Sequence, residues 1–365
     1  MPKRNALKID YLLLATFLIL LGIGLTVLAS ASSDLGKIDF NDPYHFLRDQ
    51  IIIGLGIGGI GFLLGLFIDY KVYKKLAPII LFGSVGLLLI TFTPLGTTLG
   101  GAQRWITIGS FTIQPSELLK MTMIIYLAAW LSNSHINRIK SFSEGLIPFL
   151  SIVGFVSLLL LFQKSTSAAV VIGVSSLFLY FVAGAKWKFV FMVIALGVFL
   201  LTIFVVITPY RLDRVKTFLD PSQDTQGSSY QANQALTIVG SGGFFGVGFG
   251  QSSAKAHLPE RIGDSIFAII AEEFGYLGVT VVGTLFFTMV GRAFFISKKI
   301  KDRFGRLLII GLATVIGFQA FVHMGAASAL LPTTGVPLPF ISFGSFSLAV
   351  FMTMVGIMLS VQRNG

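Results

Sequence analysis

The sequence predicts an all-α polytopic membrane protein. Of its 365 residues, 54% are hydrophobic and only 12% are charged, whereas about a quarter of the residues are charged in a typical soluble domain. A helix that crosses a bilayer needs about 20 mostly apolar residues, so a mean hydropathy of +0.85 leaves room for roughly ten such helices. We expect one transmembrane domain over residues 1–365 and no separate soluble domain.

Ten apolar runs are the predicted transmembrane helices. They cover residues 11–28, 51–68, 77–95, 115–131, 146–162, 166–184, 189–208, 266–296, 307–330 and 344–361. The first run ends in Ala29-Ser30-Ala31-Ser32, which resembles a signal-peptide cleavage site. Because this run is longer than the apolar core of a signal peptide, about 7 to 15 residues, we interpret it as an anchor that is not cleaved.

The charges predict the orientation. Ten spans place both termini on one side, and a cytoplasmic N-terminus puts most of the 27 Lys and Arg residues on the inner side. These are Lys3, Arg4, Lys8, Lys71, Lys74, Lys75, Arg138, Lys140, Lys186, Lys188, Arg292, Lys298, Lys299, Lys301, Arg303, Arg306 and Arg363. That distribution satisfies the positive-inside rule. The net charge of +11 is therefore mainly a topology signal, and nucleic acid is not an expected partner.

The connection between the seventh and eighth predicted helices, residues 209–264, is a large extracytoplasmic loop. Connections of this length are usually functional or disordered. Its apolar content argues for order and includes Phe218, Leu219, Tyr230, Leu236, Ile238, Phe244, Phe245 and Leu258. The glycine-rich stretch 240–250 lacks the offsets of a dinucleotide fingerprint. Its glycines permit close approach to another surface, either a ligand or a helix.

The residue types available limit the chemistry. The chain has no cysteine, which excludes disulfides, thiolate nucleophiles and cysteine-ligated metals. No HExxH or other metal-binding spacing occurs, and His257 is interpreted as an interfacial loop residue. Catalysis must therefore depend on carboxylates, on Lys or Arg, or on the backbone.

Charged residues beside apolar spans are candidate site residues, because each costs roughly 2.5 to 3.5 kcal/mol at mid-bilayer. Glu117 and Lys120 lie three residues apart at the start of the fourth span, hence on one helix face. One interpretation is an internal ion pair in a capped helix. The other is that Lys120 and Arg104 face an anionic headgroup at the outer interface.

Two further groups lie at the outer ends of spans. Lys164, in the turn between spans five and six, is expected to reach water, with a phosphate contact as the alternative. Arg211 and Arg214 belong to a basic cluster on the outer side, which the positive-inside rule does not explain. Local salt bridges with Asp213 and Asp220 are the alternative to anion binding there.

Asp264 stands where the chain enters the eighth span, after Glu260. If the helix begins near Asp264, then Asp264 and Glu272 lie eight residues apart on one face. Asp264 is then either a helix N-cap or a catalytic carboxylate, and the spacing does not decide between the two roles.

These segments, taken together, resemble the SEDS family of bacterial membrane proteins, which includes FtsW, RodA and SpoVE. The resemblance covers nearly the whole chain. It includes Ser30-Ala31-Ser32, Gly101-Ala102-Gln103-Arg104-Trp105-Ile106, Gln114-Pro115-Ser116-Glu117-Leu118 with Lys120, residues 210–221, Gly240-Ser241-Gly242-Gly243, Leu258-Pro259-Glu260, Asp264 with Ile266-Phe267, Glu272-Glu273-Phe274-Gly275, and Leu331 to Ser342. Residues 211–215 and 230–234 look more like FtsW or SpoVE than RodA.

The resemblance implies a peptidoglycan glycosyltransferase that polymerises lipid II outside the membrane. The matching family position makes Asp264 the candidate general base for attack on the donor sugar with inversion. Positive charge would stabilise the pyrophosphate leaving group, supplied by Arg104, Lys120, Arg211, Arg214 or a divalent cation such as magnesium or manganese. Glu117, Glu260 and Glu272 complete the candidate substrate-binding set. The implied partners are a class B penicillin-binding protein transpeptidase and the division or elongation machinery.

Three departures from the family pattern occur. Gln163-Lys164-Ser165 replaces the usual Gln-Pro-Asp, Ser265 replaces Phe, and Gly344-Ser345-Phe346-Ser347 replaces Gly-Gly-Ser-Ser.

Two other functions compete with that of a glycosyltransferase. A lipid II flippase needs a polar path across the membrane, whereas the ionisable residues within or beside spans cluster at the outer ends. A non-catalytic scaffold that recruits a transpeptidase would leave Asp264 as a cap.

Overall fold

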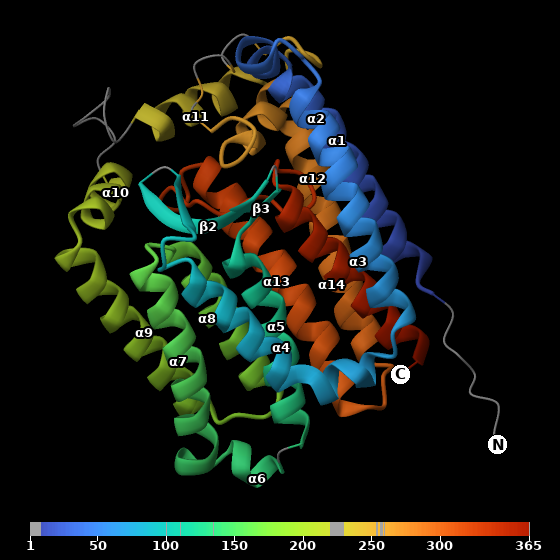
Figure 1. Cartoon of the computed structure of the whole chain (residues 1–365), viewed down its shortest axis with the longest axis vertical. Coiled ribbons are helices and arrows are strands. Elements are labelled where there is room, and N and C mark those ends of the chain that lie inside the picture. The colour runs from blue at the N-terminus through green and yellow to red at the C-terminus, as the bar shows by residue number, and fades with distance from the viewer. Residues whose placement is uncertain are drawn as a thin grey trace.

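A computed structural model describes residues 9–99, 101–109, 111–133, 135–219, 230–252, 255, 258 and 260–364. The chain is a bundle of long helices (Figure 1). The helices are α1 Tyr11–Phe40, α2 His45–Asp49, η1 Gln50–Leu55, α3 Gly56–Phe67, α4 Tyr70–Ile90, α5 Pro115–Asn133, α6 Ile136–Ile139, η2 Phe142–Leu146, α7 Ile147–Phe162, α8 Thr166–Val182, α9 Trp187–Ile207, α10 Pro209–Leu219, α11 Tyr230–Ser241, α12 Ile266–Ser297, α13 Arg303–Ala327 and α14 Ser345–Asn364. A helix lies at each predicted span.

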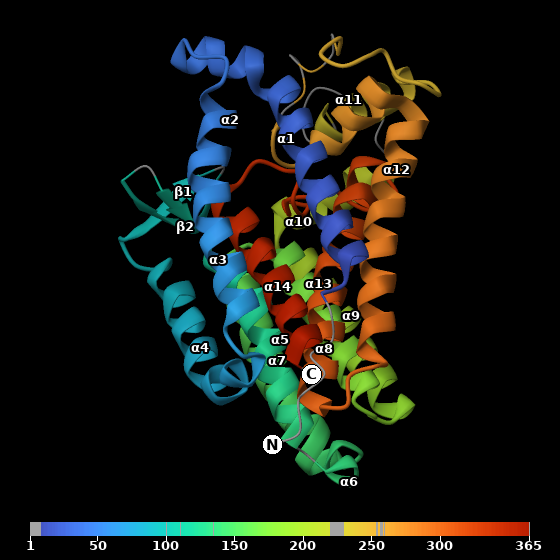
Figure 2. The ribbon, with the colours of Figure 1, turned by 90° about the vertical axis from the view of Figure 1, so that its right-hand side faces the viewer.

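Eight helical segments in the described part of the chain are long and apolar enough to cross a membrane. They are residues 11–40, 45–67, 70–90, 142–162, 187–207, 266–297, 303–327 and 345–364. The start of α1 and the ends of α12 and α14 meet in the lower half of the view, while α10 and α11 lie toward the opposite end (Figure 2). The chain is therefore a polytopic membrane protein.

Aspartate side chains start several of these helices. Asp10 accepts a hydrogen bond from the Leu13 N–H, and Asp302 accepts one from the Gly305 N–H. Asp69 does the same at the start of α4 for the Lys71 N–H. Each cap satisfies a backbone donor that has no partner within its helix.

The core of the bundle is formed by α5, α13 and α14, whose residues are mostly buried. Glycines let α3 pack directly on α14, because a Cβ on Gly65 would lie only 2.8 Å from the Thr353 carbonyl oxygen. By contrast, α9 is apolar and only its residues Phe189 and Val190 are buried, as expected of a helix whose surface faces lipid.

The prediction of an all-helical chain is wrong between α4 and α5. β1 Gly96–Leu99, β2 Ala102–Ile108 and β3 Phe111–Ile113 form an antiparallel sheet in the order β1-β2-β3. Gly96 pairs with Ile106, and Ile106 with Ile113. These strands are short and rich in Thr and Ile, residues that favour strands. The sequence predicts an outer connection for this stretch, because it is not one of the ten apolar runs.

The predicted loop 209–264 contains α10 and α11, while residues 220–229 and His257 lie outside the described residues. Its glycine-rich stretch contacts a helix. A Cβ on Gly242 would lie 1.9 Å from the Ala271 carbonyl oxygen, and the Val247 N–H donates to the Glu272 carbonyl at 2.9 Å. α12 is kinked at Gly275, where φ is 65°. The stretch thus supplies donors to carbonyls beside the kink.

Candidate active site

Residues 328–344, here called the α13–α14 strap, hold the candidate site together. The Thr333 carbonyl accepts a hydrogen bond from Arg214 Nη1 at 2.9 Å. Ser342 Oγ donates to the Gly263 carbonyl at 2.8 Å, and the Phe343 N–H donates to the Ile262 carbonyl at 2.8 Å. The strap thereby ties α10 to the segment that carries Asp264.

Asp264 is not the cap of α12. The helix begins at Ile266 with Ser265 in the N-cap position, so the cap interpretation is wrong. The helix therefore begins two residues after Asp264. Glu272 lies on α12, 3% exposed, and accepts a hydrogen bond from Ser252 Oγ.

The Asp264 carboxylate faces a space shared with Arg104. A methyl group built on Gly335 of the strap would lie 3.7 Å from Arg104 Nη1 and 3.7 Å from Asp264 Oδ2. Burial, and then the charge of Glu260, raise the pKa of Asp264 to about 7, while Arg214 and Arg104 oppose this rise. A carboxylate with a pKa near neutrality can accept a proton and release it again at physiological pH.

Glu260 belongs to the turn before Asp264. Its φ of 48° is in the left-handed region, and its carbonyl accepts hydrogen bonds from the N–H groups of Gly263 and Ser265. The Glu260 side chain is exposed. The turn therefore presents Glu260 beside Asp264 at the surface.

Arg104 projects from β2. Its Nη2 donates a hydrogen bond to the Lys164 carbonyl, and Lys164 Nζ donates to the Gly101 carbonyl at 3.3 Å. Lys164 has a φ of 60°. The turn between α7 and α8 thus supports the sheet that carries Arg104. Lys164 therefore makes a structural contact with this sheet.

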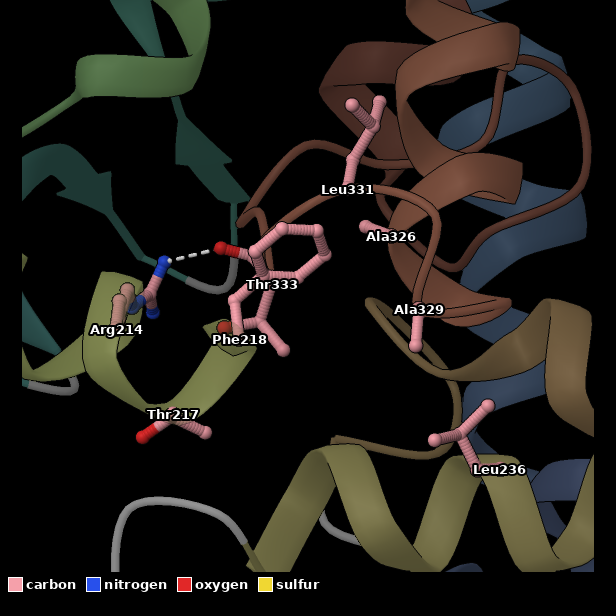
Figure 3. A pocket seen from close by; sticks show the side chains of 8 residues that line it. All are labelled: Arg214, Thr217, Phe218, Leu236, Ala326, Ala329, Leu331 and Thr333. Atoms are coloured by element: carbon pink, nitrogen blue, oxygen red, sulfur yellow. Dashed lines mark hydrogen bonds between the residues drawn. The ribbon is translucent and has the colours of Figure 1, made fainter. Parts of the chain in front are cut away.

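Arg211 and Arg214, both on α10, have different surroundings. Arg211 donates from Nε to Thr166 Oγ1 at 2.9 Å, and from Nη2 to the Leu161 carbonyl at 2.7 Å. Arg211 is therefore turned toward the ends of α7 and α8. Arg214 is turned toward Thr333, beside a pocket (Figure 3) lined by Arg214, Thr217, Phe218, Leu236, Ala326, Ala329, Leu331 and Thr333. The structure thus brings Arg214, Arg104 and Asp264 together and places Arg211 elsewhere.

Glu117 and Lys120 form the internal ion pair. Lys120 Nζ lies 2.7 Å from Glu117 Oε1, with the side chains 0% and 1% exposed. Lys120 Nζ also donates to Gln319 Oε1, and Ser347 Oγ donates to Glu117 Oε2 at 3.1 Å. The prediction that Lys120 faces an anionic headgroup together with Arg104 does not fit this closed cluster, because the Lys120 charge does not reach the surface.

Sequence reasoning missed Gly335 and Gln319. Gly335 lies in a segment noticed only as part of the family resemblance, and Gln319 is one of several polar residues in the apolar run 307–330, with Thr314, His323 and Ser328. A polar side chain within an apolar run was the signal available for Gln319, since buried polar groups normally have hydrogen-bond partners. No cluster of three or more His, Asp or Glu side chains that could hold a metal occurs in the ranges that the structure describes.

The fold and site define a polytopic membrane protein with a titratable carboxylate and guanidinium groups at one end of the bundle. A family model described as "cell cycle protein", FtsW/RodA/SpoVE, matches residues 10–365. The chain belongs to this family, and it is accordingly a multi-pass protein of the cytoplasmic membrane.

Known relatives match the chain over nearly its full length. It is 36% identical to a probable peptidoglycan glycosyltransferase FtsW of Geobacter sp. (strain M18), over 97% of this chain and 96% of the relative. It is also 36% identical to stage V sporulation protein E of Bacillus subtilis, covering 97% of each.

Two solved structures share the fold. A chain from the structure titled "Structural coordination of polymerization and crosslinking by a peptidoglycan synthase complex" is 26% identical, covers 98% of both chains and has a TM-score of 0.79. Rod shape determining protein RodA of Thermus thermophilus is 26% identical, with 98% of both chains covered and a TM-score of 0.71.

Proposed function

We propose that this protein is a peptidoglycan glycosyltransferase that polymerises lipid II, with Asp264 as its general base. The observation that carries the proposal is the space at Gly335, which Asp264 and Arg104 both face. A base and a cation that face the same space suit a reaction that removes a proton from one substrate and releases an anion from the other.

The proposed reaction joins two sugars. Asp264 accepts the proton of the acceptor GlcNAc 4-hydroxyl while that oxygen bonds to C1 of the donor MurNAc. The bond between C1 and the pyrophosphate oxygen breaks with inversion, and undecaprenyl pyrophosphate leaves with the electron pair. Asp264 then releases its proton to water. A positioned base typically contributes about 10² to 10⁴ in rate.

Arg104 and Arg214 are the proposed pyrophosphate ligands. Both lie close enough to lower the pKa of Asp264, and guanidinium groups bind phosphate oxygens in pairs. The structural contacts of Arg211 and Lys120 give them a positioning role here. Glu260, the exposed carboxylate beside Asp264, could help to hold a divalent cation, because Mg²⁺ commonly binds one or two carboxylates plus substrate phosphates. Such an ion would neutralise charge on the leaving group.

We also infer ten spans with both termini in the cytoplasm. α8 has 17 residues, which reaches the lower limit for a span. α5 carries Glu117 and Lys120 fully buried, so crossing would expose neither charge to lipid. The site then opens outside the membrane, and the polyprenyl tail lies among the spans.

A class B penicillin-binding protein and the division or elongation machinery are the proposed partners, supported by the synthase complex of similar fold.

Purified protein, with and without the transpeptidase, would be given labelled lipid II in detergent. We expect Asp264→Asn to reduce glycan synthesis at least about 100-fold. The matched control is Asp213→Asn, since Asp213 is exposed on α10, and it should retain activity. Full activity of a folded Asp264→Asn variant would refute the base role.

A flippase would move lipid II between leaflets without polymerising it. Vesicles with labelled lipid II in the inner leaflet separate the two functions. We expect no exposure of the label at the outer surface. Exposure of the label without glycan synthesis would favour transport. Binding of the transpeptidase with neither transport nor glycan synthesis would favour a scaffold.

A further inference from the structure

A second pocket lies at the other end of the bundle. It has a volume of about 370 Å³, within the usual range for ligand pockets of about 300 to 1,000 Å³. It is formed where α1 begins and where α12 and α14 end. Its lining residues are Ile9, Asp10, Tyr11, Leu12, Arg292, Phe295, Ile296, Lys299 and Gln362. We call it the terminal pocket.

The terminal pocket carries an excess of positive charge. Arg292 contacts Asp10 Oδ2 through Nε at 2.8 Å and through Nη2 at 2.7 Å. Asp10 also accepts the Leu13 N–H at 3.0 Å, so its charge is shared between two donors. Lys299 forms no ion pair with any acidic group in the described part of the chain. Arg292 and Lys299 both lie over the Phe295 ring, at 5.1 and 4.8 Å from its centre.

Apolar side chains stand exposed beside these cations. Tyr11 is 75% exposed, and Leu12 and Phe295 are each 47% exposed. The positive-inside rule accounts for basic residues at the inner ends of spans, but it requires neither a pocket nor two cations gathered on one ring. Cations at the polar boundary with an apolar flank beside them match a molecule with an anionic head and acyl chains.

We infer that the terminal pocket binds the headgroup of an anionic phospholipid. The lipid phosphate contacts Lys299 and Arg292, and the glycerol and upper acyl carbons pack against Tyr11, Leu12 and Phe295. Inorganic phosphate would contact only the two cations, whereas a phospholipid would also contact the apolar side chains. An experiment can therefore distinguish the two ligands. This site is independent of the proposed glycosyltransferase chemistry.

The test is lipid retention by the full chain, delipidated in detergent and measured by native mass spectrometry. Phosphatidylglycerol and phosphatidylcholine with the same acyl chains are compared. We expect phosphatidylglycerol to bind about fivefold more tightly, the effect of one basic residue near a membrane surface. Lys299→Gln should remove this preference, and Lys299→Arg should keep it.

Lys298→Gln is the matched control, because Lys298 is the exposed neighbouring residue and does not line the pocket. Equal binding of the two lipids by the wild type, or an equal loss in both Gln variants, would overturn the inference. Inorganic phosphate at millimolar concentration should not displace phosphatidylglycerol. Displacement would assign the pocket to a free anion and count against a lipid.

Discussion

Two pairings of carboxylate and cation in this protein differ in how completely they are satisfied. Glu117 and Lys120 touch at 2.7 Å, and both are almost fully buried. Gln319 and Ser347 occupy further positions around the pair. Asp264 faces Arg104 across the space at Gly335, and its carboxylate accepts no hydrogen bond from the part of the chain that the structure describes.

The difference separates structure from chemistry. A buried pair whose hydrogen-bonding positions are filled by the protein has no capacity left for a substrate. A carboxylate that is partly desolvated and lacks donors keeps a raised pKa and can exchange a proton. We therefore expect changes at Glu117 to act on stability, and changes at Asp264 to act on rate and, through its ionisation, on the pH dependence of stability.

Breaking the buried pair should have the largest effect on stability. Glu117→Gln leaves the Lys120 charge buried without its counter-ion, which costs about 3 to 5 kcal/mol. Thermal unfolding in detergent would measure this loss. A double variant, Glu117→Leu with Lys120→Met, removes both charges and should recover much of it. An unchanged unfolding temperature in Glu117→Gln would mean that the pair is open to water.

Acidification should act at Asp264. Because burial raises its pKa to about 7, the base is ionised above that value and protonated below it. We expect kcat/KM for polymerisation to be constant above pH 7 and to fall about tenfold per pH unit below it. A profile that stays flat to pH 5 would argue against this carboxylate as the base.

Acidification should lower activity through Asp264 but raise the stability of the folded protein. The ordinary pKa of 3.8 is lower than the value of about 7 in the folded protein. The folded state is therefore stabilised by the bound proton at low pH and loses that stability as pH rises through 7. Asp264→Asn cannot ionise, so its unfolding temperature should exceed that of the wild type at pH 8 and approach it near pH 4.

The same comparison explains what the sequence could predict. Apolar runs located every long helix, because the hydropathy of a span is local in sequence. The i, i+3 spacing also placed Glu117 beside Lys120. The contact between the strap and Asp264 joins Gly335 to a residue about seventy positions away, and no local pattern records such a contact. The same holds for Arg211 and Arg214, three residues apart on α10, whose partners are decided by the elements packed around them.

The smallest expected effect is at Gly335. A methyl group there would meet Arg104 and Asp264 at 3.7 Å, an ordinary contact, so Gly335→Ala should leave the unfolding temperature unchanged. The methyl would nevertheless occupy the space proposed for the reacting oxygens, and we expect kcat/KM to fall about tenfold, or about 1.4 kcal/mol. Gly83→Ala is the control, because that glycine of α4 has nothing within 4 Å. Equal activity of both variants would show that the reacting oxygens do not pass between Arg104 and Asp264.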